Sequence, residues 1–314
     1  SPTKIAGDEF FYEHVHFRFP GNYLMAMLVG SQIALTMPGI DPKTFQSRWP
    51  TLSDCAQQLS LTRWADYQVL REIQSRLNRP PFINQLNHLE RDQKIHFELF
   101  GLRPGIQAQA FAGQNEAYRK AIQARPNDWM LHDQHGRFLE AFGQREEAAK
   151  AWRKVIDLMP HHFLARLQLG NLLNTPATAV EAERYFSEAI RIRPNIPEAV
   201  NGLGLALAYQ GRSEAAFRQF EKALRMRPDF PEAYVNRGLA LWREKHLTEA
   251  LAQFEKALVL NSNLISAHVH AGKLLIEQGK TNEAQTHFAA ATRLDPQLES
   301  TLPAGRSQTP ERPR

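Results

Sequence analysis

Small, aromatic and proline residues recur through the middle and end of the chain with a fixed step of 34 residues. Four columns keep this step: Gly136, Gly170, Gly204, Gly238 and Gly272; Ala148, Ala182, Ala216, Ala250 and Ala284; Trp152, Phe186, Phe220, Phe254 and Phe288; and Pro126, Pro160, Pro194, Pro228 and Pro296. Only Ser262 interrupts the proline column. Four columns that share one period over five copies indicate a repeat architecture in which each copy is one structural unit.

Each column has a packing role in a pair of antiparallel helices. A glycine in the first helix and an alanine in the second let the two axes approach closely, and the aromatic residue fills the space toward the next pair. The proline ends the second helix, because it has no N–H to donate. Glycine at Gly143, Gly211 and Gly279 suits a turn that begins in the left-handed conformation. The second copy differs, with NTPATAV at 174–180 in place of a glycine turn.

The repeat resembles the tetratricopeptide repeat family, most clearly in PEAVNGLGLALAYQGRSEAAFRQFEKALRMRP and PEAYVNRGLALWREKHLTEALAQFEKALVLNS. The resemblance covers about 105–296, with five full repeats over 129–296 and a partial repeat before them. It implies an all-α fold, an α-solenoid of helix pairs stacked into a right-handed superhelix. It also implies a concave groove that is lined by the first helix of each repeat, because small rotations between stacked repeats curve the array.

Polar side chains occupy first-helix positions that packing does not use, and these are candidates for the groove. They are Arg137, Asn171, Asn201, Tyr209, Asn236, Arg243, His270 and Lys273. Asparagine offers both a donor and an acceptor to an extended backbone, so the expected partner is a protein or peptide segment. The alternative is that many of these positions are solvated helix surface. The lysine- and asparagine-rich clamp with which the family holds a terminal carboxylate has no counterpart in register, so no C-terminal ligand is predicted.

Charge and cysteine content narrow the classes of function. Residues 128–296 carry 21 basic and 20 acidic residues, a net charge of +1. Because acidic and basic residues are almost equal in number, the repeats have no basic stripe that could bind phosphates. We therefore expect no nucleic acid partner. No glycine-rich phosphate loop is present, and no cofactor is expected. Cys55 is the only cysteine, which excludes an intrachain disulfide and a multi-cysteine zinc site and does not indicate a compartment.

Residues 1–40 do not follow the repeat and contain DEFFYEHVHFRFPGNYLMA at 8–26. Three interpretations stay open for this segment. In the first, His14 and His16 share one face of a strand and bind a metal, but two histidines without a placed third ligand do not define a site, so no metal site is predicted. In the second, the aromatic residues pack against the first helices of the chain. In the third, Glu13 and His16 form an acid–histidine pair.

The spacing Glu13-x-x-His16 resembles the last motif block of the SGNH (GDSL-like) hydrolases, with Glu13 where that family has aspartate. The resemblance implies that Glu13 and His16 are catalytic, the carboxylate orienting the imidazole that takes the proton of a serine nucleophile. The family's serine and oxyanion-hole blocks lie upstream, and the residues before Asp8 leave no room for them. Because the chain begins at Ser1, we expect a processed or C-terminal part of a longer protein.

The remaining segments are assigned by their apolar pattern. The apolar stretch from Tyr23 to Ile40 predicts a buried helix over about 22–37 that is too short for a membrane span of ~20 residues. Residues 41–104 predict a helical connector or cap, which begins with a short helix capped by Ser53. Residues 297–314 predict a disordered tail, because they lack apolar periodicity.

The sequence therefore predicts a protein–protein interaction scaffold that binds a peptide or protein segment in the concave groove of the repeats. The alternative is the C-terminal portion of an SGNH-like esterase or acyl-modifying enzyme whose repeats recruit a substrate or partner. The chain alone is not expected to be an enzyme, because it contains no nucleophile block.

Overall fold

The computed structural model describes residues 19–36, 41, 49–59, 62–78, 88–102 and 111–302. This part of the chain contains fifteen α-helices, one 3-10 helix and no strand, so the all-α prediction is confirmed. The chain divides into two compact units, Ser1–Lys154 and Val155–Arg314, and the second unit holds four of the five full repeats.

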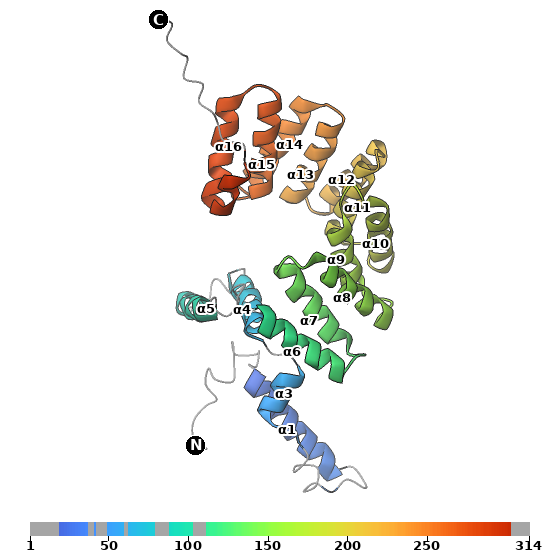
Figure 1. Ribbon diagram of the computed structural model, residues 1–314, viewed down its shortest axis with the longest axis vertical. Coiled ribbons are helices and arrows are strands. Elements are labelled where there is room, and N and C mark those ends of the chain that lie inside the picture. Colours follow the sequence, from blue (N-terminus) through green and yellow to red (C-terminus); the bar gives the residue numbers. More distant parts are fainter. Residues whose placement is uncertain are drawn as a thin grey trace, which may run out of the picture. The chain divides into compact units, whose positions relative to one another are not determined.

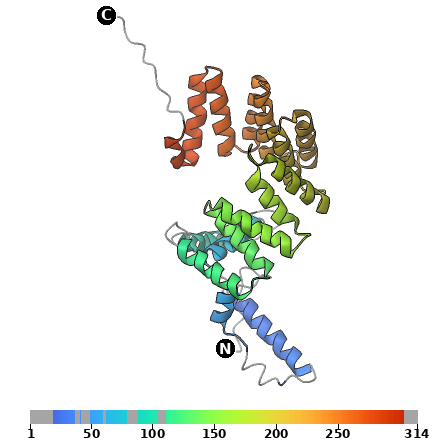
Figure 2. The same cartoon turned by 45° about the vertical axis from the view of Figure 1, so that its right-hand side comes forward.

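Helices of the second unit come in pairs with the predicted period. The first helices of the pairs are α9 (Phe163–Leu173), α11 (Pro197–Tyr209), α13 (Pro231–Arg243) and α15 (Ile265–Glu277). The second helices are α10 (Ala179–Ile192), α12 (Ser213–Met226), α14 (Leu247–Leu260) and α16 (Thr281–Leu294). Each first helix packs on its own second helix, and α10, α12 and α14 also pack on the first helix of the next pair. Figure 1 and Figure 2 show α13 to α16 as neighbouring hairpins, which is the arrangement of an α-solenoid.

The glycine column makes room for the aromatic column of the same pair. A Cβ atom added to Gly204 would lie 2.6 Å from Cε1 of Phe220, and one added to Gly170 would lie 2.8 Å from Cε1 of Phe186. The Phe186 ring also reaches the next pair, where it lies against Gly202. Both rings are completely buried. The aromatic residue therefore fills the gap within a pair, which the sequence did not predict, as well as the predicted gap toward the next pair.

Short turns join the two helices of a pair, and most of them use the left-handed backbone conformation. Gly143, Gly211 and Gly279 have φ angles of 72°, 75° and 76°, which confirms the left-handed turns predicted at these glycines. Lys245 has a φ of 65° at the same place in its repeat. The second repeat is different: α9 ends at Leu173, and Thr178 Oγ1 in the longer turn donates a hydrogen bond of 2.5 Å to the Leu173 carbonyl.

The first unit contains a further set of helices. They are α1 (Phe19–Thr36), α3 (Leu52–Gln58), α4 (Arg63–Leu77), α5 (His88–Leu102), α6 (Phe111–Ala124), α7 (Trp129–Ala141) and α8 (Arg145–Leu158), which runs past the end of the unit. Buried Leu70 and Leu77 of α4 pack with Ile95 and Leu99 of α5. The helices expected in the connector are present, and α6 lies within the partial repeat that precedes residue 129.

Helix α3 begins with Thr51 as its N-cap, not with the predicted Ser53. The hydroxyl of Thr51 accepts a hydrogen bond of 3.0 Å from the Asp54 N–H, and the Asp54 carboxylate accepts one of 3.1 Å from the Thr51 N–H. This reciprocal capping box requires an acceptor three residues after the N-cap. Asp54 fulfils that role for Thr51, so Ser53 lies inside the helix.

Helix α1 confirms the helix predicted near residues 22–37 but not its burial. Five of its apolar side chains are between 42% and 64% exposed, namely Leu24, Met25, Leu28, Val29 and Ile33. The helix has no charged residue, so the sequence contains no polar stripe that would mark its solvent side. Among the described helices, none combines the length and the apolar character needed to cross a bilayer.

The prediction of a disordered tail over 297–314 is wrong for its first residues. Residues Pro296–Ser300 form a 3-10 helix, η4, that packs on α16. The Asp295 carboxylate caps it by accepting a hydrogen bond of 3.1 Å from the Gln297 N–H. Leu302 then packs against the buried cluster around Phe288. The Leu302 side chain thereby covers apolar surface that the last repeat would otherwise expose. Residues 303–314 of the predicted tail lie outside the described residues.

Candidate binding surface of the repeats

The first helices of the second unit contact one another as well as their own partners. Helix α9 packs on α11, α11 on α13, and α13 on α15, so the four helices form one continuous layer. We call the partly or fully exposed side chains of α9, α11, α13 and α15 on this layer the first-helix face. It consists of Asn171, Leu205, Tyr209, Asn236, Leu239, Arg243, His270, Lys273 and Glu277. Six of the eight residues predicted to line a groove therefore share one layer.

Tyr209 and Arg243 lie close together on this face. The Arg243 guanidinium carbon is 5.6 Å from the centroid of the Tyr209 ring, which is cation–π distance and joins α11 to α13. Arg243 and Lys273 are both exposed. Within the described part of the chain, neither has a carboxylate within ion-pairing distance. The face thus offers two cations to the solvent.

His270 stands 34 residues after Asn236 and has the same place in its repeat. Its ring stacks on Phe254 with a centroid separation of 5.9 Å. Burial, with a smaller effect of the nearby Lys273 charge, lowers the pKa of His270 to about 4. The imidazole is therefore neutral at pH 7, with one nitrogen that donates and one that accepts a hydrogen bond.

Asn201 is not part of the first-helix face, although it was predicted there. It is only 6% exposed, and its Oδ1 atom has no hydrogen-bond partner among the described residues. The same place in the neighbouring repeats holds Leu167 and Val235, which are also buried. Position 201 is therefore a packing position. A comparison of this column along the repeats would have identified it.

The remaining two predicted residues, Asn171 and Arg137, each make polar contacts within their own repeat. Asn171 is exposed on α9, and its Nδ2 donates a hydrogen bond of 3.4 Å to Gln168. Arg137 belongs to the first unit, where its Nε lies 2.8 Å from the Asp133 carboxylate. Its guanidinium carbon is 5.9 Å from the centroid of the Trp152 ring. Arg137 is thus held by two contacts inside its own repeat, and its place relative to the face of the second unit is not assigned.

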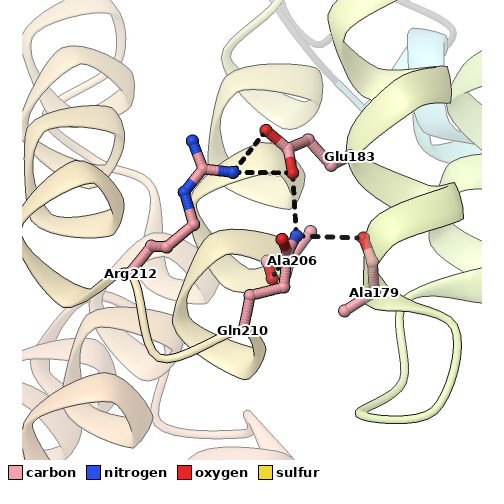
Figure 3. Close-up of polar contacts among 5 residues, drawn as sticks. All are labelled: Ala179, Glu183, Ala206, Gln210 and Arg212. Atoms are coloured by element: carbon pink, nitrogen blue, oxygen red, sulfur yellow. Dashed lines mark hydrogen bonds and ion pairs between the residues drawn. The ribbon is translucent and has the colours of Figure 1, made fainter.

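A polar cluster joins the second and third repeats beside the turn after α11 (Figure 3). Gln210 Nε2 donates to Glu183 at 2.9 Å and to the backbone carbonyls of Ala206 at 3.2 Å and Ala179 at 3.4 Å. Arg212 Nη1 lies 2.8 and 2.9 Å from the two carboxylate oxygens of Glu183. The cluster fixes the start of α10 against the turn that precedes α12.

The later repeats have comparable polar contacts at their turns. Ser213 donates a hydrogen bond to Glu244. Glu277 accepts hydrogen bonds of 2.5 Å from Trp242 Nε1 and 3.0 Å from Lys245 Nζ, and these two donors hold the pKa of Glu277 below its ordinary value. Sequence reasoning missed these contacts, which join residues 31 to 35 positions apart. The available signal was a carboxylate and a donor separated by about one repeat.

The predicted N-terminal chemistry lies outside the described residues. Glu13 and His16, with His14, fall in 1–18, so the esterase interpretation stays a prediction. Over the part of the chain that the structure does describe, no group of three or more His, Cys, Asp or Glu side chains is arranged to hold a metal ion.

Profiles of the tetratricopeptide repeat family match residues 201–264 and 265–298, which run from the second turn of α11 past the end of α16. No curated protein matches the chain. A tetratricopeptide repeat protein from Parabacteroides merdae is similar in structure, with a TM-score of 0.57 and 15% identity over 74% of this chain and 87% of that one. The Cut9–Hcn1 hetero-tetramer of the APC/C gives a TM-score of 0.51 and 15% identity over 87% of this chain and 50% of that one. At such identities the two structures support the solenoid fold alone.

Proposed function

We propose that this chain, whose residues 201–298 match profiles of the tetratricopeptide repeat family, is an interaction scaffold whose first-helix face binds a segment of a partner protein. The repeats themselves support the broader role of a protein-interaction scaffold. The observation that carries the finer proposal is the continuous layer of α9, α11, α13 and α15. Stacked helix pairs curve, and the curvature produces an extended concave surface that such proteins use for binding.

The first-helix layer is the expected concave side. Its helices are close enough to contact one another, whereas each second helix packs chiefly between its own first helix and the next. The layer in which successive helices lie closer is the inner side of a curved stack. We therefore place the partner segment on the first helices.

The chemistry of this face suits a polypeptide. Asn236 offers an amide that can donate to and accept from a peptide backbone, and neutral His270 offers the same pair of functions. Tyr209 adds an amphipathic ring. The sequence of 128–296 has no basic stripe, so we do not predict that the repeats bind nucleic acid.

Capture of partner proteins by the immobilised full chain tests the proposal. The variant Asn171→Ala/Asn236→Ala removes two reachable amides from the first helices, and we expect it to reduce the amount of captured protein several-fold, measured by quantitative mass spectrometry. The control Asn263→Ala/Asn282→Ala removes two exposed amides outside the first helices and should capture as wild type does. Far-ultraviolet circular dichroism should be the same for all three proteins. Equal capture by the two double variants would count against the first-helix face.

A further inference from the structure

The charges of α13 and α15 are unevenly distributed along the first-helix face. Arg243 is the last residue of α13, and Lys273 lies in the middle of α15. A cation at a helix C-terminus is stabilised by the helix dipole, but Lys273 is too far from the end of its helix to gain from it. Arg237 is the second cation of α13, and its buried Nε has no hydrogen-bond partner among the described residues.

Among the described residues, the nearby carboxylates form no ion pair with Arg243 or Lys273. Glu277, the last residue of α15, already accepts hydrogen bonds from Trp242 and Lys245 of the preceding repeat. Glu232 lies in the first turn of α13, eleven residues before Arg243 and therefore about 16 Å from it along the helix axis. Exposed Glu244 follows Arg243 directly and accepts a hydrogen bond from Ser213. Within the described residues, Arg243 and Lys273 thus form no ion pair, so both cations can pair with a carboxylate of a partner.

Apolar side chains border the two cations. Leu205 packs against the buried cluster that contains Phe220, and Leu239 packs against the cluster that contains Phe254, while both stay half-exposed. Lys273 stands 34 residues after Leu239 and so has its place in the next repeat. Apolar Leu205 of α11 and Leu239 of α13 are thus followed at this place by a cation on α15.

We propose that the first-helix face of the third to fifth repeats selects an acidic segment of a partner protein in which carboxylates alternate with apolar side chains. This inference rests on the proposed function and adds the chemistry of the partner. Carboxylates of the segment pair with Arg243 and Lys273, and its apolar side chains cover Leu205, Leu239 and the ring of Tyr209. Complementary charge of this kind suppresses neutral and basic competitors.

Selection from a random library of displayed dodecapeptides on the immobilised full chain tests the proposal. We expect the enriched peptides to be rich in Asp and Glu interleaved with apolar residues. The strongest peptide, synthesised with a fluorophore, should bind the variant Arg243→Gln/Lys273→Gln at least about tenfold more weakly than wild type by fluorescence anisotropy. The control Arg191→Gln/Lys222→Gln removes an exposed arginine and an exposed lysine from second helices α10 and α12 and should bind within about twofold of wild type.

Each other outcome overturns the proposal in a different way. Enrichment of neutral or basic peptides, or equal affinity for the Arg243→Gln/Lys273→Gln variant, overturns the acidic partner and leaves the scaffold function standing. Preferential binding of a labelled twelve-nucleotide single strand at the same two cations would assign them to phosphates instead. A library that yields no enriched peptide would overturn this proposal and the proposed function together.

Discussion

At the scale of the residue, each repeat depends on positions where a side chain must be apolar or absent. Leu167 and Val235 fill one such column, and Asn201 interrupts it with a buried amide. Gly204 leaves the space that the Phe220 ring occupies. Packing determines which residue type suits positions 201 and 204. Each position therefore gives a prediction about stability that does not depend on a binding partner.

Replacement of Asn201 by valine should raise the free energy of unfolding by about 1 kcal/mol. The valine restores the residue type of the next repeat and removes an Oδ1 atom that has no partner in the described part of the chain. Urea denaturation followed by circular dichroism measures the change. Asn171→Val, at an exposed position of α9, is the control and should not stabilise. A loss of stability in Asn201→Val would indicate that the amide has a bonding partner, such as a buried water molecule.

Replacement of Gly204 by alanine should lower the free energy of unfolding by about 1–3 kcal/mol. The new Cβ would lie 2.6 Å from a ring atom of Phe220, which is completely buried, so the ring or the helix must shift to accept it. Gly113→Ala is the control, because that helical glycine has nothing within 4 Å and alanine favours a helix by up to about 1 kcal/mol. Thermal denaturation should therefore separate the two variants, and equal melting temperatures would refute the packing assigned to the glycine column.

At the scale of the element, the helices are joined by turns, stacked rings and a few polar contacts between repeats. His270 is one titratable member of these contacts, because its ring packs on Phe254 of the preceding helix and is neutral there at pH 7. The link between α14 and α15 should consequently depend on pH.

Stability should fall as the solution is acidified through the range in which an unfolded histidine takes up a proton. His270 has a pKa of about 4 when folded and near 6.5 when unfolded, so the unfolded state binds the proton first. The contribution of neutral His270 is fully present above pH 6.5 and is lost progressively down to about pH 4. At pH 5 the loss is about 2 kcal/mol.

The variant His270→Asn, which copies Asn236 of the preceding repeat, should remove that part of the pH dependence. Urea midpoints at pH 7.5 and pH 5 measure it, with His161→Asn as a control at an exposed histidine. The difference between the two midpoints should shrink for His270→Asn and stay the same for His161→Asn. An unchanged difference in the first variant would mean that His270 is not buried in its neutral form.

The elements that the sequence predicted best are those whose residues repeat. The spacing of the glycines, aromatic residues and prolines placed the helix pairs of 129–296, because packing requires the same side chains in every copy. Features that occur once were predicted less well. Exposed α1 and the 3-10 helix after Asp295 have no second copy to compare with, and the hydrogen bonds of Glu183 and Glu277 depend on how repeats stack.

At the scale of the whole molecule, the candidate site is a property of the stack and not of any one repeat. Tyr209, Arg243 and Lys273 come from three successive first helices. Their chemistry could be read from the sequence, but the exclusion of Asn201 and the engagement of Glu277 by its neighbours required the structure. Binding should therefore need several intact repeats, since each contributes only a few side chains to the face.

A crystal structure of the full chain with a selected acidic peptide bound would test the central claim most directly. The account predicts that the peptide crosses α11, α13 and α15, with its carboxylates at Arg243 and Lys273 and its apolar side chains on Leu205 and Leu239. A peptide bound along the second helices α12, α14 and α16 would contradict it.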